Sequence, residues 1–313
     1  MHPRPPGRSG LSVAPLMLGT NVFGWNVDEP TAFAILDAFV DAGFNAIDTA
    51  NTYSRWVPGH SGGESETVIG KWLKKSGKRD KVVLATKVGE DMGEGRSLRK
   101  DYIARECEAS LKRLQTDRID LYQTHFDDEV TPPEETMAAY AQLIVQGKIR
   151  AAGVSNVSPK RLRASLEASQ RLGIPRYEAL QPLYNLSDRK EFETGYEALC
   201  REQQIGVIPY YGLAAGFLTG KYRLPEHADK NPARAGRLKK YLDARGSRIL
   251  QAVDQVAARH SAKPAQVSLA WLIGRVTAPI VSATNVQQLL ELAQAPSVKL
   301  SDEDHALLDK ASG

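Results

Sequence analysis

The chain of 313 residues contains only two cysteines, Cys107 and Cys200. Their positions match no metal-ligand spacing and no pattern demands a disulfide between them, which favours a reducing compartment, and we expect the cytoplasm. No apolar run reaches the roughly 18 residues that a membrane-spanning helix needs. The N-terminal stretch MHPRPPGRSG lacks the apolar core of a signal peptide. The sequence therefore predicts a protein that does not span a membrane.

Two glycine-rich phosphate-binding motifs are also absent. GxGxxG is missing, and the nearest glycine cluster, GEDMGEG at 89–95, has the wrong spacing. GFLTGKY at 216–222 is not a P-loop, because only three residues separate Gly216 from Gly220 and Tyr222 replaces the required serine or threonine. The net charge of +4 is mild, and it suggests an acidic ligand more readily than a nucleic acid, which requires a concentrated basic face.

Short apolar runs alternate with amphipathic segments along most of the chain. The expected strands are 16–20, 45–49, 81–87, 118–125, 148–156, 177–181, 204–210 and 278–283. The expected helices are 30–42, 64–75, 98–115, 133–146, 158–171, 188–203, 262–274 and 285–293. Several helices open with start signals, such as Ser158 as an N-cap followed by Pro159 at the first helical position.

Strict alternation of this kind favours a parallel sheet. Eight units fit the (β/α)8 TIM barrel, whose typical size is about 250 residues. A doubly wound open sheet is the alternative, and the missing glycine fingerprint argues against it. The longest interruption, residues 211–245, predicts a functional loop after strand seven. We found no inter-domain linker, so the prediction is an α/β fold with a single barrel domain over residues 1–313.

Active sites of such barrels lie at the carboxyl ends of the strands. Every predicted strand ends in a polar residue, and the set is Thr20, Asp48, Lys87, His125, Ser155 with Asn156, Gln181, Tyr210 and Ser282. Taken singly, each has an ordinary structural explanation, such as a cap, a solvated charge or a packing residue. Taken together, Asp48, Lys87 and His125 would meet at one end of the barrel, beside Tyr53 in the loop after strand two.

The chemistry of these four residues is that of general acid–base catalysis at a carbonyl oxygen. A tyrosine is a poor proton donor at neutral pH, and a nearby ammonium lowers its pKa by stabilising the phenolate. We expect Lys87 to act on Tyr53 in this way, Asp48 to keep Lys87 charged, and His125 to orient the substrate oxygen. No activated nucleophile, electron source or second metal ligand accompanies them, so redox chemistry must come from a bound cofactor.

Seven segments of the chain resemble the aldo-keto reductase superfamily, and they occur in the order of that family from about Leu16 to Leu300. They are DTANTY (48–53), GGESETVIGKWL (62–73), ATKVG (85–89), LYQTHFDD (121–128), GKIRAAGVSN (147–156), LQPLYN (180–185) and YYGLAAGFLTGKY (210–222). The likeness is greatest to the bacterial oxidoreductases and the potassium-channel β-subunits of the superfamily.

The resemblance implies that Asp48, Tyr53, Lys87 and His125 form a catalytic tetrad and that NADPH, rather than NADH, lies across the barrel mouth. It implies that Tyr210 stacks on the nicotinamide, that the loop from Tyr211 to Lys221 wraps the pyrophosphate, and that Arg234 meets the 2′-phosphate. The implied cofactor contacts are Gly19, Thr20, Asn21, Asp48, Ser155, Asn156, Gln181, Tyr210, Tyr211, Gly212, Leu213, Ala214, Gly216, Leu218, Lys221, Arg234, Ser282, Thr284, Gln288 and Glu291.

The chain also departs from the family pattern. Asn21 replaces an aromatic that lines the substrate pocket in many members, and Trp25 and Trp56 are the expected substitutes, with Tyr53 and His125 as further substrate contacts. Tyr211-Gly212 replaces a common Ser-Pro, Leu292 replaces a common asparagine, and Ser282 and Gln288 stand where the aldose-reductase branch has basic residues.

The function implied is NADPH-dependent reduction of small aldehydes or ketones. A regulatory subunit that holds NADP(H) with little turnover is the alternative. A barrel glycosidase is disfavoured, because it needs two carboxylates facing each other across the mouth.

Overall fold

The structure is a computed structural model that describes residues 2–224 and 236–313. Within these residues, parallel strands curl around a common axis in the order β7-β6-β5-β4-β3-β2-β1-β8. They are β1 (Met17–Gly19), β2 (Ala46–Asp48), β3 (Val83–Val88), β4 (Ile119–Thr124), β5 (Ile149–Ser155), β6 (Tyr177–Gln181), β7 (Gly206–Val207) and β8 (Ile280–Val281). Backbone hydrogen bonds from Ile280 to Pro209 and from Thr277 to Val207, both 2.9 Å, join the two ends of the sheet. The predicted (β/α)8 barrel is confirmed.

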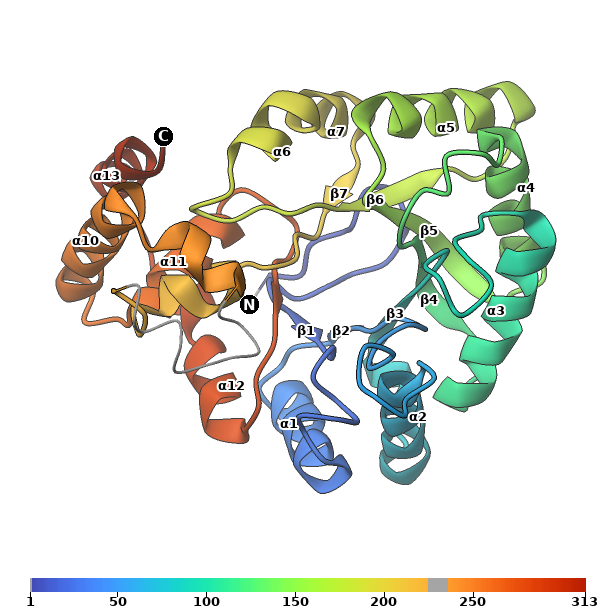
Figure 1. The fold of residues 1–313 in the computed structure, drawn as a ribbon, viewed down its shortest axis with the longest axis horizontal. Coiled ribbons are helices and arrows are strands. Elements are labelled where there is room, and N and C mark those ends of the chain that lie inside the picture. The colour runs from blue at the N-terminus through green and yellow to red at the C-terminus, as the bar shows by residue number, and fades with distance from the viewer. Residues whose placement is uncertain (1, 225–235) are drawn as a thin grey trace.

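Helices surround the strands, as Figure 1 shows. They are α1 (Glu29–Asp41), α2 (Glu64–Ser76), α3 (Lys100–Leu114), α4 (Pro133–Val145), α5 (Pro159–Leu172), α6 (Lys190–Gly195), α7 (Glu197–Gln203), α10 (Ala244–Arg259), α11 (Pro264–Ile273), α12 (Val286–Leu292) and α13 (Asp302–Ser312). Short 3-10 turns are η1 (Arg79–Lys81), η2 (Ala214–Thr219), η3 (Lys239–Tyr241) and η4 (Ala295–Ser297). Among the helices of these two ranges, none is long and apolar enough to cross a bilayer.

Two helices were not expected from the sequence, and one expected helix is divided. The segment 188–203 forms α6 and α7, which are separated at Tyr196 by a backbone turn with φ −122°. The unexpected helices, α10 and α13, pack together beside the chain terminus (Figure 1). α10 precedes α11 in the connection between β7 and β8, and α13 follows α12 after the last strand. A pattern of one helix per strand therefore does not predict either of them. The predicted cap of α5 is confirmed, since Ser158 accepts from the Arg161 N–H at 3.1 Å.

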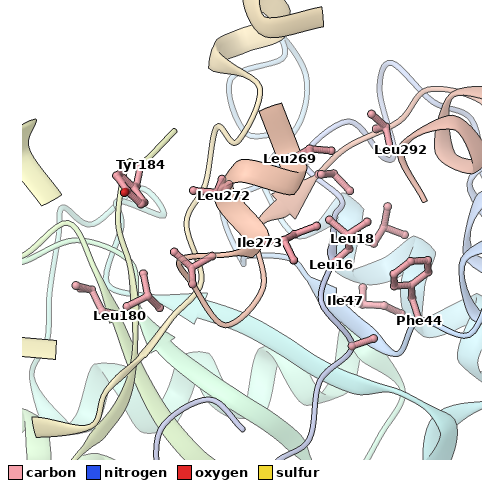
Figure 2. Packing of buried hydrophobic residues seen from close by; sticks show 14 of the residues in the cluster. Leu16, Leu18, Phe44, Ile47, Leu180, Tyr184, Leu269, Leu272, Ile273 and Leu292 are labelled. Atoms are coloured by element: carbon pink, nitrogen blue, oxygen red, sulfur yellow. The ribbon is translucent and has the colours of Figure 1, made fainter. Parts of the chain in front are cut away.

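Two hydrophobic clusters divide the core. The larger cluster lies between the strands and the surrounding helices, and Figure 2 shows part of it, including Leu16 and Leu18 near β1, Ile47 of β2 and Leu272 of α11. The smaller one fills the barrel interior with side chains that include Met17, Ala46, Val83, Ala85, Leu121, Ala151, Ala179, Ile208 and Ile280.

The alternation of side chains along each strand sets what lies above this interior cluster. Successive residues of a strand point to opposite faces, so the residue two positions after an interior residue is also interior. The residues two positions after members of the interior cluster are polar, and they are Asp48, Lys87, Gln123, Gln181, Tyr210 and Ser282. A further step of two along the same strand face leads to His125 and to Ser155. The register places Lys87 opposite Gln123 and Ser155 opposite Gln181. A polar layer therefore covers the carboxyl end of an apolar plug.

A buried carboxyl group at the start of α13 makes the stability of the fold depend on pH. Burial alone raises the pKa of Asp304, but hydrogen bonds from the His260 ring at 2.7 Å, the Ser301 backbone and Arg259 outweigh it and lower the pKa to about 2. The unfolded pKa of an aspartate is roughly 4, so this group stabilises the fold above that pH and loses its contribution as the pH falls through about 2.

We therefore expect Asp304→Asn to lower the free energy of unfolding by roughly 2–3 kcal/mol at neutral pH. The difference from wild type should shrink as the pH falls between about 4 and 2, because the wild-type carboxylate is then lost too. Urea unfolding at several pH values measures this. Asp302→Asn, in the same turn but exposed, is the matched control, and a difference that did not vary with pH would contradict the assignment.

Candidate active site

The side chain of Lys87 connects two of the predicted catalytic residues. It projects from the end of β3 and is fully buried, as is the Asp48 side chain at the end of β2. Its ammonium nitrogen Nζ donates to Asp48 Oδ2 at 2.6 Å, to the Thr49 carbonyl at 2.8 Å and to Tyr53 Oη at 2.8 Å. An ammonium has three N–H donors, and each has an acceptor here. The position of Nζ is therefore fixed on all three sides.

The carboxylate of Asp48 is held equally firmly. Oδ2 faces Lys87, and Tyr53 Oη lies 3.4 Å from the same oxygen. Oδ1 accepts from the amide of Gln181 at 3.0 Å and from the amide of Gln123 at 3.2 Å. A buried carboxylate requires such partners because burial without them is very costly. Asp48 is thus an anchor with contacts to residues from three other strand ends and the β2–α2 loop.

Gln123 was not among the predicted site residues. Its signal was present in the sequence, since Leu121, Gln123 and His125 share one face of the strand by the period of two. The neighbouring strand leaves space for it at Gly153, where a Cβ atom would lie only 2.8 Å from Gln123 Cγ. We expect that any side chain at position 153 would displace the Gln123 amide from Asp48.

His125 completes the predicted group of four, and it reaches the others through ring contacts. Its ring centroid lies 6.2 Å from that of Tyr53, with the planes at 75°. Nδ1 lies 3.5 Å from Thr52 Oγ1. Its backbone is fixed by a hydrogen bond from its N–H to the Val88 carbonyl at 2.7 Å. The four side chains predicted from distant sequence positions therefore lie together at the carboxyl end of the barrel.

The charge states of these residues follow from burial and from their neighbours. Burial lowers the pKa of Lys87, and the charge and hydrogen bond of Asp48 oppose that effect, as predicted. Burial, and then the positive charges of Lys87 and Arg96, lower the pKa of His125 well below its ordinary value. Its imidazole is consequently neutral at physiological pH.

The expected lowering of the Tyr53 pKa is wrong for this structure. Burial, followed by the charge and hydrogen bond of Asp48, raises the pKa of Tyr53 well above 10. The sequence indicated a nearby ammonium, but it contained no measure of burial or of how close the carboxylate approaches the phenol. At neutral pH the Tyr53 hydroxyl therefore always carries its proton.

Residues expected around a nicotinamide form a connected set on β5, β6 and the end of β7. Ser155 Oγ donates to the Gln181 carbonyl at 2.7 Å, and the Asn156 amide donates to Ser155 Oγ at 3.0 Å and to the His125 carbonyl at 2.9 Å. Tyr210 Oη donates to Asn156 Oδ1 at 3.1 Å. The structure brings all of these together, with the Gln181 amide nitrogen directed at Asp48.

The loop after β7 has an unusual backbone. Tyr211, Ala214 and Ala215 have φ values of 56°, 49° and 57°, and Gly216 has 98°. Non-glycine residues adopt this region at a cost and often do so in anion-binding concavities formed by successive N–H groups. Leu218 is buried and Leu213 and Lys221 are more exposed. Gly212 approaches β8 and α11 closely. Arg234 lies outside the described residues.

The remaining predicted cofactor contacts lie around β1 and β8. Gly19 packs so tightly against β8 that a Cβ atom would lie 2.6 Å from Ile280. Ser282 Oγ donates to Asn21 Oδ1 at 3.1 Å, and Thr20 Oγ1 donates to the Asp48 carbonyl at 2.9 Å.

Three expected adenosine contacts lie near the start of α12 and on the helix itself. Thr284 donates through its backbone N–H and its hydroxyl to Gln288 Oε1 at 3.1 and 3.0 Å. Glu291 is instead ion-paired with Lys263. Its carboxylate therefore already has a partner, and a cofactor contact there would have to compete with that pair.

Two tryptophans extend an aromatic series outward from Tyr53. The ring of Trp56 lies 6.2 Å from that of Tyr53, and the ring of Trp25 lies 6.0 Å from that of Trp56. Trp25 is 40% exposed and Trp56 is 53% exposed. Exposed aromatics in contact with a buried polar site are suited to line an entrance.

Neither cysteine belongs to this site. Cys107 and Cys200 are buried free thiols, and burial raises the pKa of each to about 12. In the two described ranges, no cluster of His, Cys, Asp and Glu side chains could hold a metal ion.

The comparisons with known proteins agree with this fold. The model of the Aldo/keto reductase family matches residues 15–312. The uncharacterized oxidoreductase YrpG of Bacillus subtilis (strain 168) is 37% identical, over 95% of this chain and 91% of that protein. The aldo-keto reductase YhdN of the same bacterium is 33% identical over 95% and 89%. L-glyceraldehyde 3-phosphate reductase of Escherichia coli O157:H7 is 33% identical over 97% and 90%.

These relatives are named as an oxidoreductase, an aldo-keto reductase and an aldehyde reductase. The chain belongs to the aldo/keto reductase family. The resemblance inferred from seven short segments is confirmed over nearly the whole chain.

Proposed function

We propose that this protein reduces aldehydes or ketones to alcohols with NADPH, and that Tyr53 supplies the proton. The observation that carries the proposal is the fully buried Lys87 ammonium, which lies 2.6 Å from Asp48 and 2.8 Å from Tyr53 Oη. Lys87 already donates to the Tyr53 oxygen, so the hydroxyl hydrogen of Tyr53 is free to point elsewhere. As a hydrogen-bond donor, the Tyr53 hydroxyl makes a long contact of 3.4 Å with Asp48 Oδ2. A substrate oxygen can readily replace this acceptor.

Proton transfer then depends on the ammonium. As a carbonyl oxygen gains negative charge, Tyr53 gives it a proton and becomes a phenolate, and Lys87 stabilises that phenolate at hydrogen-bond distance. The raised pKa of Tyr53 keeps the donor protonated at all ordinary pH values. His125 is neutral and can hydrogen-bond the same oxygen without carrying a charge of its own. When bound, NADPH supplies the hydride.

Several residues fit this cofactor. The side-chain amide nitrogen of Gln181 donates to Asp48, so the side-chain oxygen Oε1 of Gln181 is the group available to a carboxamide. Consecutive positive φ values at Ala214, Ala215 and Gly216 suit a backbone cradle for a pyrophosphate, with the exposed Lys221 nearby in the chain adding charge. Preference for NADPH over NADH rests on Lys221 and on Arg234.

We infer that residues 1–313 act as one domain in the cytoplasm, with a small carbonyl compound as partner and neither nucleic acid nor a membrane. The name of the E. coli relative specifies a phosphorylated aldehyde as its substrate, and we carry over only the aldehyde. Trp25 and Trp56 supply aromatic walls for it.

The experiment that tests the proposal is turnover by purified protein. With NADPH and 4-nitrobenzaldehyde, we expect the near-ultraviolet absorbance of NADPH to fall at a rate proportional to enzyme concentration, and NADH to support a lower kcat/KM. Binding of NADPH is measured in parallel by calorimetry. Tight binding without turnover on a broad panel of aldehydes and ketones would favour the regulatory subunit instead.

A further inference from the structure

Arg96 lies beside the catalytic residues without being one of them. It belongs to the segment between β3 and α3, and its guanidinium carbon lies 4.3 Å from the centre of the Phe126 ring. The Phe126 ring lies 5.0 Å from the His125 ring, which in turn lies 6.2 Å from Tyr53. The Phe126 ring therefore contacts both the guanidinium of Arg96 and the ring of His125.

The surrounding loop holds this guanidinium in place but leaves part of it unused. Arg96 Nε donates to Glu90 Oε1 at 3.1 Å. The loop is tightened by Asp91 Oδ1, which accepts from the N–H groups of Gly93 and Gly95 at 2.6 and 2.9 Å. Among residues 2–224 and 236–313, no hydrogen-bond acceptor meets the two terminal nitrogens of Arg96. The side chain is 48% exposed, so these donors are available to a ligand.

The charge of Arg96 also reaches the mouth of the barrel. It is one of the causes, after burial and Lys87, that lower the pKa of His125. The carboxylate of Glu90 offsets part of this charge, because it accepts a hydrogen bond from Arg96 Nε. The two terminal nitrogens nevertheless present a planar fork of donors, which is the geometry that binds carboxylate or phosphate groups in a bidentate manner.

We propose that Arg96 selects carbonyl substrates that carry an anionic group, a carboxylate or a phosphate, about one aromatic ring away from the reacting carbonyl. This rests on the proposed function, because it places the carbonyl oxygen at Tyr53 and His125. The spacing is inferred from the Phe126 ring, which contacts both the guanidinium and the His125 ring. Arg96 is then a specificity residue that contributes to substrate binding and has no part in proton transfer.

A second arginine provides an internal comparison. Arg105 on α3 also stacks on an aromatic ring, that of Tyr102 at 5.1 Å, and also pairs with a glutamate, Glu94 at 2.9 Å. Among the described residues, the Tyr102 ring contacts no catalytic residue's ring, whereas the Phe126 ring contacts that of His125. If stacking and pairing were the whole role of such arginines, substitution of either residue would have the same effect.

The test compares substrates of nearly equal shape that differ in charge. 4-Nitrobenzaldehyde is neutral, and 4-carboxybenzaldehyde and 4-formylphenyl phosphate are anionic. In Arg96→Gln we expect kcat/KM to fall by about 10- to 100-fold for the anionic aldehydes and by less than about 3-fold for the neutral one, because charge-assisted hydrogen bonds are lost. Arg96→Lys should lose less, Arg105→Gln should change neither class, and the two anions distinguish carboxylate from phosphate recognition.

Two further measurements separate this inference from the proposed function. Glu90→Gln keeps an acceptor for Arg96 Nε but removes the competing charge, so it should raise the preference for the anionic aldehydes. Binding of 4-(hydroxymethyl)benzoate to protein loaded with NADP+, followed by calorimetry, should weaken in Arg96→Gln whether or not the wild type turns over. An equal loss for charged and neutral ligands, or no loss for either, would overturn the role of Arg96, even if Tyr53 proves essential.

Discussion

Replacing Tyr53 by phenylalanine is expected to lower kcat by about 100- to 10,000-fold, the usual contribution of a positioned general acid. Binding of NADPH should remain within a factor of about 3 of wild type, because only a hydroxyl group is removed. The loss should appear in kcat rather than KM, since proton donation matters in the transition state. Single-turnover kinetics with saturating NADPH measures it directly.

The control for this variant is Tyr140→Phe. Tyr140 is also buried and also loses a hydroxyl hydrogen bond, in its case with Thr124 at 2.9 Å, but it lies in the outer cluster rather than at the mouth. It should lose stability of roughly 1 kcal/mol and little activity. If Tyr53→Phe retained a tenth or more of the wild-type kcat, Tyr53 would not be the proton donor.

Replacing Lys87 by methionine is expected to abolish most turnover and to destabilise the fold by roughly 3–5 kcal/mol. The reason is that the Asp48 carboxylate, 1% exposed, loses the only cation that pairs with it in the described part of the chain, and a buried charge without a partner is very costly. Urea unfolding at neutral pH gives the stability, and the same samples give the turnover rate. Binding of NADPH reports whether the barrel mouth is still formed.

A double variant separates the two effects of this substitution. Asp48→Asn combined with Lys87→Met removes both charges and should recover much of the lost stability while activity remains absent. Lys71→Met is the surface control, since Lys71 pairs with Glu29 at 2.6 Å in an exposed position and should lose less than about 1 kcal/mol. Strictly additive losses at positions 48 and 87 would show that the pair is not coupled.

Much of the fold was predictable because its signals are local. Strand-length apolar runs and helix caps such as Ser158 depend on neighbours in the chain. Each predicted strand overlaps an observed one, although β7 and β8 are only two residues long, and the Ser158 cap is present. The helices α10 and α13 escaped prediction because they add to the alternation rather than repeat it. Gln123 escaped because the predicted strand 118–125 ends at His125, so that Gln123 lies inside the strand rather than at its end.

The proposed catalytic residues were likewise predictable only in part. The identities and strand-end positions of Asp48, Lys87 and His125 could be stated from the sequence, since parallel strands bring their carboxyl ends together. The loop residue Tyr53 was added because its distance along the chain from Asp48 is short. Their convergence in the structure supports that reasoning, whereas the direction of the Tyr53 pKa could not be anticipated.

The sequence by itself determined the barrel, the family and the residue types at its mouth, because these follow from periodicity and from short-range patterns. Tertiary structure alone decided which of those residues touch and how deeply they are buried. It raised the pKa of Tyr53, directed Gln181 to Asp48 and engaged Glu291 with Lys263. The physical reason is that desolvation and hydrogen bonding depend on distances between residues far apart in the chain, and those distances exist only after folding.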